Sequence, residues 1–343
     1  MQEQQAEDDL FLALPPRCRG TGGMYPYAMN KITLGISSCL LGNPVRYDGG
    51  HKLDHFLTDT LGRYVEWVPV CPEAACGLPV PREAMHLVGD PRDPRLVTIR
   101  TGIDHTVRMK QWSKERLADL EKEGLCGFVF KARSPSSGMR GVKIYNEAGV
   151  PYATGSGLFA RAFMDRFPLV PVEDEGRLHD PAIRENFIER VFVFRHWQEF
   201  LRQDGSLAGL VAFHRDHKYL VMAHSQKHYS MLGKMVASGK KMRRSELHAG
   251  YIETLMEGLK LLATQKKNTN VLQHMAGYFK DLLSSDEKKE LQEVITTYHD
   301  GLVPLIVPVT LIQHYVRKYQ EPYLATQVYL FPHPLELMLR NHV

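Results

Sequence analysis

Three cysteines in two short segments are the residues with the clearest chemical potential. Cys71 and Cys76 lie five positions apart in "VPVCPEAACGLPVPRE", and Cys39 lies upstream in "SSCLLGNPVRYDGG". Cysteine thiolates are soft ligands for zinc and for iron–sulfur clusters. The spacing fits no zinc pattern. Two interpretations therefore compete: an iron–sulfur cluster with three thiolate ligands and one open iron, or buried structural thiols.

Glu73 lies between two of these cysteines, in the segment "CPEAAC". A carboxylate close to a metal and partly withdrawn from water is a natural general base. The alternative is a structural role, in which Glu73 caps the helix that follows the loop.

These side chains can act together only if their loops meet, and the first part of the chain predicts that they do. Runs rich in β-branched and aromatic residues predict strands over 31–37, 64–70, 126–132 and 169–174, a small extra strand over 94–100 and a helix over 107–124. This alternation indicates an α/β fold class with a mostly parallel, Rossmann-like sheet covered on both faces. Cys39 and Cys71 each follow a strand directly, so we expect them at one sheet edge, together with the loop 133–138.

The remaining two cysteines are expected outside this site. Cys126 opens the strand after which Ser134 comes, and eight residues at ~3.3 Å each separate the two by roughly 26 Å. We interpret Cys126 as an inert buried thiol. Cys18, in the polar N-terminal stretch, is interpreted as an unpaired surface thiol.

The second half of the chain has a helical pattern. Periodicity predicts helices over 175–202, 207–239, 245–264, 268–284 and 284–301, and hence an all-α C-terminal domain. We expect a poorly ordered N-terminal extension over 1–30, an α/β domain over 31–176, a connecting helix over 177–204 and a helical domain over 205–343. Met29 is an alternative start of the ordered protein.

Composition predicts an ordinary globular protein. Of its 343 residues 43% are hydrophobic and 24% charged, and no apolar run approaches the roughly 20 residues that span a bilayer. The first residues are acidic rather than basic, so we expect no secretory signal, no membrane partner and a cytoplasmic location. In that compartment cysteines serve as ligands or catalytic groups rather than in disulfides.

The loop motifs resemble a known family. "ISSCLLGNPVRYDGG", "VPVCPEAACGLPVPRE" and "FKARSPSSGM", in this order between about Ile32 and Glu175, resemble the iron–sulfur-dependent thiouracil desulfidases. The helical half, with "FHRDHKYLVMAHSQKHY" and "EPYLATQVYLFPHPLELMLRNHV", is similar to the YbgA-type domain of unknown function. Together the two resemblances cover nearly everything after residue 30.

The resemblance implies a [4Fe-4S] cluster held by three cysteines, with a fourth iron that binds the sulfur of a thiolated base. Cys39 and Cys71 match two ligand positions, and Glu73 and Ser134 match the catalytic pair. The cysteine that is usual in the third loop is Ser137 here. We expect either that Cys76 replaces it as the third ligand or that the cluster is weakened.

The activity implied by the resemblance is a non-redox desulfidation. The sulfur of 2-thiouracil or a related thiolated nucleobase or nucleoside is replaced by the oxygen of water, and sulfide is released. Glu73 would deprotonate the water, while Ser134 would hydrogen-bond the developing charge or shuttle a proton. The alternative is a non-catalytic RNA- or nucleobase-binding protein with a structural or lost cluster.

Weaker candidates surround this site. Arg46 and Asp48 in "RYDGG" are placed to contact the base, although an Asx turn explains Asp48 almost as well. Lys131 and Arg133 flank the third loop and serve either an anionic substrate or surface solvation. The segment "TGSGLFARAF" (154–163) offers donors to a phosphate, but a plain helix start is the favoured interpretation.

Two patterns in the helical half predict further binding. His214, His217, His224 and His228 fall within roughly 80° of one helix face, which is compatible with a metal site but includes no carboxylate partner. Residues 211–267 hold eleven Lys and Arg against four acidic residues, a net charge of +7. Such a surface suits an RNA backbone, with thiolated tRNA as the coherent partner, or is simply a solvated face.

Overall fold

The computed structural model describes residues 31–334 and 337–341. The predicted N-terminal extension, with Cys18 and Met29, lies outside the described residues. Within the described part of the chain, no helix is both long and apolar enough to pass through a membrane.

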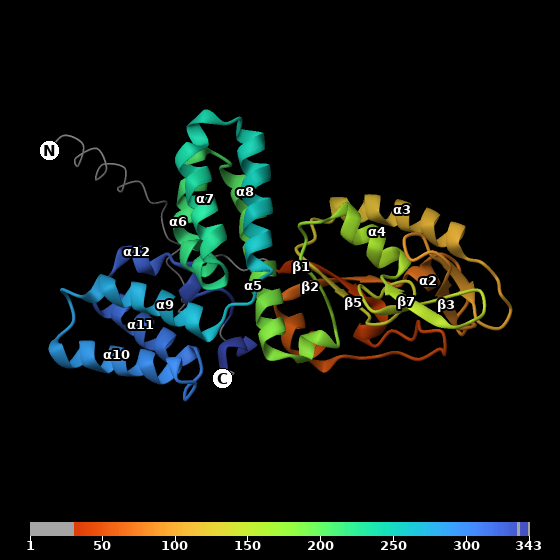
Figure 1. Ribbon diagram of the computed structural model, residues 1–343, viewed down its shortest axis with the longest axis horizontal. Coiled ribbons are helices and arrows are strands. Elements are labelled where there is room, and N and C mark those ends of the chain that lie inside the picture. Colours follow the sequence, from red (N-terminus) through yellow and green to blue (C-terminus); the bar gives the residue numbers. More distant parts are fainter. Residues whose placement is uncertain (1–30, 335–336, 342–343) are drawn as a thin grey trace. The chain divides into compact units, whose positions relative to one another are not determined.

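A four-stranded parallel sheet, sheet A, forms the centre of the α/β region (Figure 1). Its strands, in the order β2-β1-β5-β8, are β1 (Ile32–Ser37), β2 (Val65–Val70), β5 (Phe128–Phe130) and β8 (Val172–Asp174). All four were predicted, and the α/β class with a parallel sheet is confirmed. Pro69 is tolerated within β2 because that strand lies at the sheet edge, where a missing N–H breaks no ladder.

Aromatic packing explains the glycine in the central strand β1. A Cβ atom on Gly35 would lie 2.1 Å from Cδ2 of Phe128 on the neighbouring strand, so only glycine fits. The Phe128 and Phe130 rings stack with their centroids 4.2 Å apart. They belong to one face of sheet A, and Val129 belongs to the other because side chains alternate along a strand.

Helices cover both faces of sheet A, as the sequence predicts. Helices α3 (Thr106–Lys122) and α4 (Leu158–Arg166) pack with Phe128 and Phe130 in one buried cluster. Helix α5 (Pro181–Gln203) covers the opposite face, in the cluster that contains Val129.

A second sheet, sheet B, was not predicted as a sheet. Its strands, in the order β4-β3-β6-β7, are β3 (Met85–Val88), β4 (Arg95–Thr98), β6 (Val142–Tyr145) and β7 (Pro151–Gly155). Of these only β4 corresponds to a predicted strand. Strands β3 and β6 pair in parallel, and the outer pairs are antiparallel. The chain passes from sheet A to sheet B twice: from β2 through the short helix α2 (Pro72–Ala75) to β3, and from β5 to β6.

Helix α5 follows the α/β region and begins at Pro181, later than the start of the predicted stretch 175–202. The Asp180 side chain accepts a hydrogen bond from the N–H of Ile183 at 3.0 Å, and Pro181 occupies the first helical turn. Further along, Trp197 stacks on Tyr251 with ring centroids 5.6 Å apart. Helix α5 therefore shares its buried surface between sheet A and the helices that follow.

The remainder is helical, which confirms the predicted class of the C-terminal part. The helices are α6 (Leu207–His224), α7 (Gln226–Ser238), α8 (Arg244–Leu259), α9 (Gln265–Ala276), α10 (Ser285–His299), α11 (Ile306–Lys318) and α12 (Pro322–Ala325). The single stretch predicted over 207–239 divides at Ser225. The Ser225 side chain caps α7 by accepting from the N–H of His228 at 3.3 Å.

Candidate active site at the carboxyl edge of sheet A

Strand register brings the predicted loops to one edge. Ser37 is paired with Val70, and Phe130 with Asp174, so the strands end together. The N–H of Lys131 donates to Oγ of Ser37 at 2.8 Å and joins the start of the third loop to the end of β1. The loops that follow β1, β2 and β5 therefore leave sheet A side by side.

Cys39 and Cys71 are electrostatic neighbours at this edge. Burial raises the pKa of the Cys39 thiol to about 11; the Lys131 cation opposes this rise, and the Cys71 thiol adds to it. Burial also raises the pKa of Cys71. Because the thiolate form is disfavoured at both positions, a bound cation is what would stabilise it.

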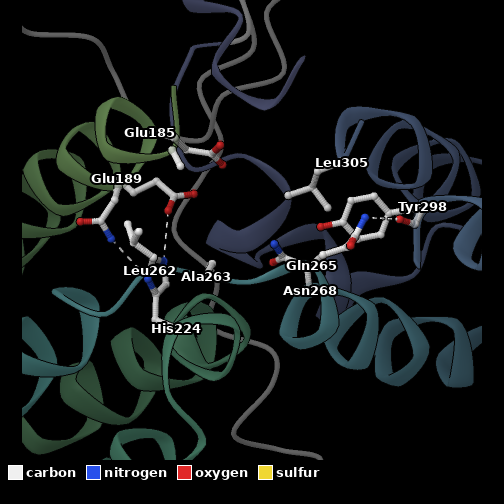
Figure 2. A pocket seen from close by; sticks show the side chains of 11 residues that line it. Glu185, Glu189, His224, Leu262, Ala263, Gln265, Asn268, Tyr298 and Leu305 are labelled. Atoms are coloured by element: carbon white, nitrogen blue, oxygen red, sulfur yellow. Dashed lines mark hydrogen bonds and ion pairs between the residues drawn. The ribbon is translucent and has the colours of Figure 1, made fainter. Parts of the chain in front are cut away.

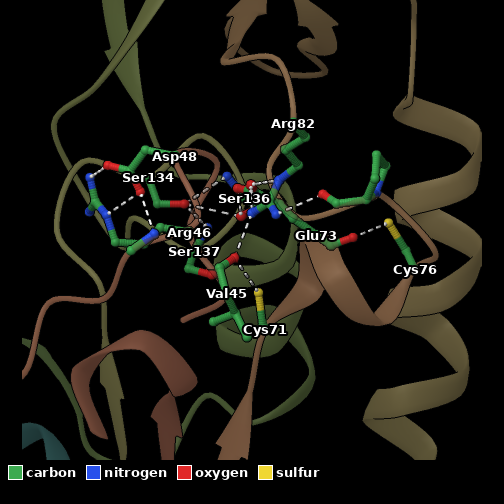
Figure 3. A network of polar contacts seen from close by, with 12 residues as sticks. Val45, Arg46, Asp48, Cys71, Glu73, Cys76, Arg82, Ser134, Ser136 and Ser137 are labelled. Carbon is green, nitrogen blue, oxygen red and sulfur yellow. Dashed lines mark hydrogen bonds and ion pairs between the residues drawn. The ribbon is translucent and has the colours of Figure 1, made fainter. Parts of the chain in front are cut away.

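Glu73 is held in a buried polar network (Figure 3). Its Oε1 accepts a hydrogen bond from Oγ of Ser136 at 2.7 Å, and its Oε2 accepts from Nε of Arg82 at 2.9 Å. The side chains of Arg82 and Glu73 are 6% and 12% exposed, so this ion pair is largely removed from solvent. The carboxylate is thereby fixed in one orientation, as a general base requires.

Arg82 also ties this network to Cys71. Its Nη2 donates to the carbonyl oxygen of Val45 at 3.0 Å, and the Cys71 thiol faces the same oxygen at 3.8 Å. Sequence reasoning missed both Arg82 and Ser136. The signal that could have found Arg82 is the need of a buried carboxylate for a cation, together with the arginine that ends "GLPVPR".

Ser134 orders the third loop and is linked to Glu73 through the hydroxyl of Ser136. Its Oγ accepts from the N–H groups of Ser136 and Ser137 at 3.3 and 3.1 Å and lies 3.0 Å from Oγ of Ser136. The hydroxyl that contacts Glu73 belongs to Ser136, which the sequence did not single out. The catalytic role of Ser134 remains a prediction.

The first N–H groups of α4 form hydrogen bonds with the third loop. The N–H groups of Leu158 and Phe159 donate to the carbonyl oxygens of Pro135 and Ser136 at 3.2 and 2.9 Å. These helix-start donors, which a phosphate would need, are thus occupied. The plain helix-start interpretation of 154–163 is confirmed.

Gly157→Ala is expected to lower the free energy of unfolding by about 1–3 kcal/mol. The added Cβ would lie 2.5 Å from the carbonyl carbon of Ser136, and backbone cannot yield as a flexible side chain does. Urea unfolding measures the change. Gly277→Ala is the matched control because its Cβ meets nothing within 4 Å. An equal effect at both positions would contradict this packing argument.

Cys76 does not join the other two cysteines. Its thiol donates to the carbonyl oxygen of Glu73 at 3.2 Å and packs in the cluster that contains Met109 of α3. In Figure 3 it lies on the other side of Glu73 from Cys71. The predicted replacement of the third ligand by Cys76 therefore finds no support in this geometry. Ser137, which occupies the third-loop position where the family usually has a cysteine, is buried, with 4% of its surface exposed.

Cys126 lies near the start of β5, as predicted, and faces α5. Its thiol lies 3.3 Å from Oε1 of Gln198, and burial raises its pKa to about 12. We expect iodoacetamide at pH 8 to leave Cys126 unlabelled in the folded protein and to label it fully in urea, as measured by peptide mass spectrometry. Rapid labelling without urea would show that the thiol is accessible.

The weaker candidates make mainly local contacts. Arg46 pairs with Asp48 at 3.4 Å, and Asp48 accepts from the N–H of Gly50 at 3.0 Å, which is the Asx turn considered above. Lys131 forms an ion pair with Glu175, both largely buried. Arg133 has a positive φ of 60°. Arg46 and Lys131 both lower the pKa of Cys39, so their charges face the cysteine site.

The four histidines of the helical part have separate partners. His214 contacts the Tyr251 hydroxyl at 3.0 Å, His217 contacts His196 at 3.3 Å, and His224 contacts Glu189 at 3.1 Å. His228 contacts Ser225 at 2.8 Å. They do not converge on one metal. In the basic segment, Arg243 pairs with Glu246 while Lys240 and Lys241 are exposed; binding of tRNA there stays a prediction.

Comparisons with known proteins agree with both predicted relationships. The family "2-thiouracil desulfurase" matches residues 34–175, and "Protein of unknown function (DUF1722)" matches residues 218–334. The uncharacterized protein YbgA of Escherichia coli (strain K12) is 31% identical over 154 residues, which are 44% of this chain and 90% of that protein.

Among solved structures, a [4Fe-4S]-dependent thiouracil desulfidase, TudS, matches with 34% identity and a TM-score of 0.36, over 44% of this chain and 95% of that one. The predicted family relationships are confirmed by the two family matches and by YbgA. The chain belongs to the YbgA family and joins a region of the 2-thiouracil desulfurase family to a DUF1722 region.

Proposed function

We propose that the α/β region is a desulfidase that replaces the sulfur of a thiolated pyrimidine, such as 2-thiouracil, with oxygen from water. One observation carries the proposal. Within the segment that matches the 2-thiouracil desulfurase family, a buried carboxylate oriented by Arg82 and Ser136 lies at the same sheet edge as Cys39 and Cys71.

The residues of this chain account for the proton transfers. The overall exchange is a thiocarbonyl plus water giving a carbonyl plus hydrogen sulfide, with no change of oxidation state. Glu73 accepts the proton of the attacking water, while Arg82 holds one carboxylate oxygen and keeps the other directed at Ser136. The Ser136–Ser134 hydroxyl pair, 3.0 Å apart, provides a route for protons away from Glu73.

The side chains at this sheet edge offer an iron–sulfur cluster two thiolate ligands and one hydroxyl ligand. Cys39 and Cys71 would hold it together with the hydroxyl of Ser137, since Cys76 faces α3. A cluster with one iron free of protein ligands would supply a soft Lewis acid for the substrate sulfur. Because an alkoxide is a harder ligand than a thiolate, we expect weaker retention of iron than three cysteines would give.

Ser137 also favours a second candidate, a nucleobase-binding protein without catalysis. The test is sulfide release from 2-thiouracil by the anaerobically reconstituted full-length protein, with binding of 2-thiouracil followed by calorimetry. Sulfide and uracil in equal amounts support the desulfidase. Binding without sulfide release from iron-loaded protein supports the second candidate and contradicts the first.

A further inference from the structure

A second polar centre lies in the part of the molecule to which no function is assigned. Glu185 and Glu189 are one turn apart on α5, so their carboxylates lie on the same face of the helix (Figure 2). One donor atom from each carboxylate and one ring nitrogen of His333 lie within 4.8 Å of one another. Two carboxylates and an imidazole from segments far apart in sequence thus converge on one point.

The orientation of His333 suits a metal ligand. Its Nδ1 faces the carbonyl oxygen of Pro334 at 3.2 Å and donates to it, which leaves the lone pair on Nε2. The Nε2 atom is buried and has no hydrogen-bond partner among the described residues, and His333 is only 4% exposed. Metal-binding histidines typically give their second N–H to a carbonyl in this way. An orphaned buried nitrogen destabilises the folded protein unless something binds it.

Arg340 and His224 hold the two carboxylates in place. Arg340 donates from Nε to Glu185 at 3.1 Å and from Nη2 to Glu189 at 2.8 Å, and His224 contacts the second oxygen of Glu189 at 3.1 Å. A carboxylate oxygen can accept more than one contact, so these interactions orient the two side chains and are compatible with metal binding.

A cavity of about 230 Å³ opens onto the same two carboxylates. Its wall includes polar groups of Asn186, His224, Asn268 and Tyr298. His333 is not part of this wall, so the cavity adjoins the site from the side of the two carboxylates and has room there for a water molecule or a small ligand.

We propose that Glu185, Glu189 and His333 form a binding site for a divalent transition-metal ion such as Zn²⁺, with its open coordination positions facing this cavity. One nitrogen and two carboxylate oxygens are a donor set that zinc accepts, and three protein ligands with an open position characterise reactive rather than structural zinc sites. Donors around a tetrahedral zinc lie roughly 3–3.5 Å apart, so small side-chain rotations close the site.

The test must distinguish zinc binding at this site from zinc binding by the cysteine thiols. Full-length protein carrying Cys39→Ser, Cys71→Ser and Cys76→Ser is titrated with Zn²⁺ by calorimetry and thermal melting, and with Co²⁺ by visible absorption. We expect one ion per chain, a higher Tm with zinc, and a cobalt spectrum of nitrogen and oxygen ligation without thiolate bands.

Glu185→Gln and His333→Gln are each expected to lower the affinity at least about tenfold. Exposed Glu253→Gln and His314→Gln are the matched controls and should leave it unchanged. Glu189 is left intact because, in addition to its contact with Arg340, it pairs with the buried His224. The proposal would be overturned if the parent protein bound no stoichiometric zinc. It would also be overturned if Glu185→Gln and His333→Gln both bound zinc as tightly as the parent protein. The metal-free Tm of each variant shows whether it is folded, and the cobalt spectrum tests the site with all three ligands in place.

Discussion

Glu73→Gln is expected to lower the rate of sulfide release from 2-thiouracil by about 10²- to 10⁴-fold, the usual contribution of a general base. Glutamine keeps the shape of the side chain and can still accept from Arg82, but it cannot take a proton from water. The measurement is the initial rate at saturating 2-thiouracil, with iron content determined on the same sample. Glu66→Gln, at an exposed position on β2, is the matched control and should retain full activity.

Stability must be separated from catalysis in this experiment. Glu73→Gln leaves Arg82, whose side chain is 6% exposed, without its counter-charge, and breaking a buried ion pair from one side costs about 3–5 kcal/mol. The double variant Glu73→Gln/Arg82→Gln removes both charges and should recover part of the lost stability without recovering activity. Rates within about threefold of the unmutated protein in a folded, iron-loaded Glu73→Gln variant would eliminate Glu73 as the base.

Cys39→Ala and Cys71→Ala are each expected to abolish retention of iron and sulfide after anaerobic reconstitution, whereas Cys76→Ala should retain both. The reason is position: the Cys71 thiol is close enough to raise the pKa of Cys39, whereas the Cys76 thiol contacts the backbone of Glu73 and packs near Met109. Iron and sulfide analysis, with about four of each per chain as the loaded value, provides the measurement.

Ser137→Cys gives the complementary result. A thiolate at this third-loop position should slow the loss of iron to a chelator, because iron in clusters prefers sulfur to oxygen. The same substitution at Ser134, whose hydroxyl organises backbone N–H groups instead, serves as the control and should not slow it. Loss of iron in Cys76→Ala together with no effect of Ser137→Cys would restore Cys76 as the third ligand.

Strands β1, β2 and β5 and the edge where their loops meet could be predicted because each strand is rich in β-branched or aromatic residues and is followed within a few positions by a cysteine or a serine. Sheet B could not. Only β4 was expected as a strand, and the sheet itself depends on pairing between segments far apart in the sequence, such as Leu87 and Ile144, which no local pattern reveals.

The partners of Glu73 illustrate the same limit within the site. Proximity in sequence favoured Cys76, but a single turn of helix between Cys71 and Cys76 directs the two thiols to different surroundings. Ser136 contacts Glu73 across 63 positions of sequence, a contact that only the folded chain defines. The choice between Ser134 and Ser136 depends on which hydroxyl the loop turns toward the carboxylate.

Glu73 and Ser136 lie on the two crossings between the sheets: Glu73 between β2 and β3, and Ser136 between β5 and β6. Their 2.7 Å hydrogen bond therefore depends on the alignment of the two sheets. A small shift of one sheet relative to the other would break the contact between Glu73 and Ser136, while the hydrogen bonds between the strands of each sheet stayed intact. If the proposed desulfidase activity depends on this contact, mild heating or low denaturant should abolish sulfide release before the circular dichroism of the protein changes.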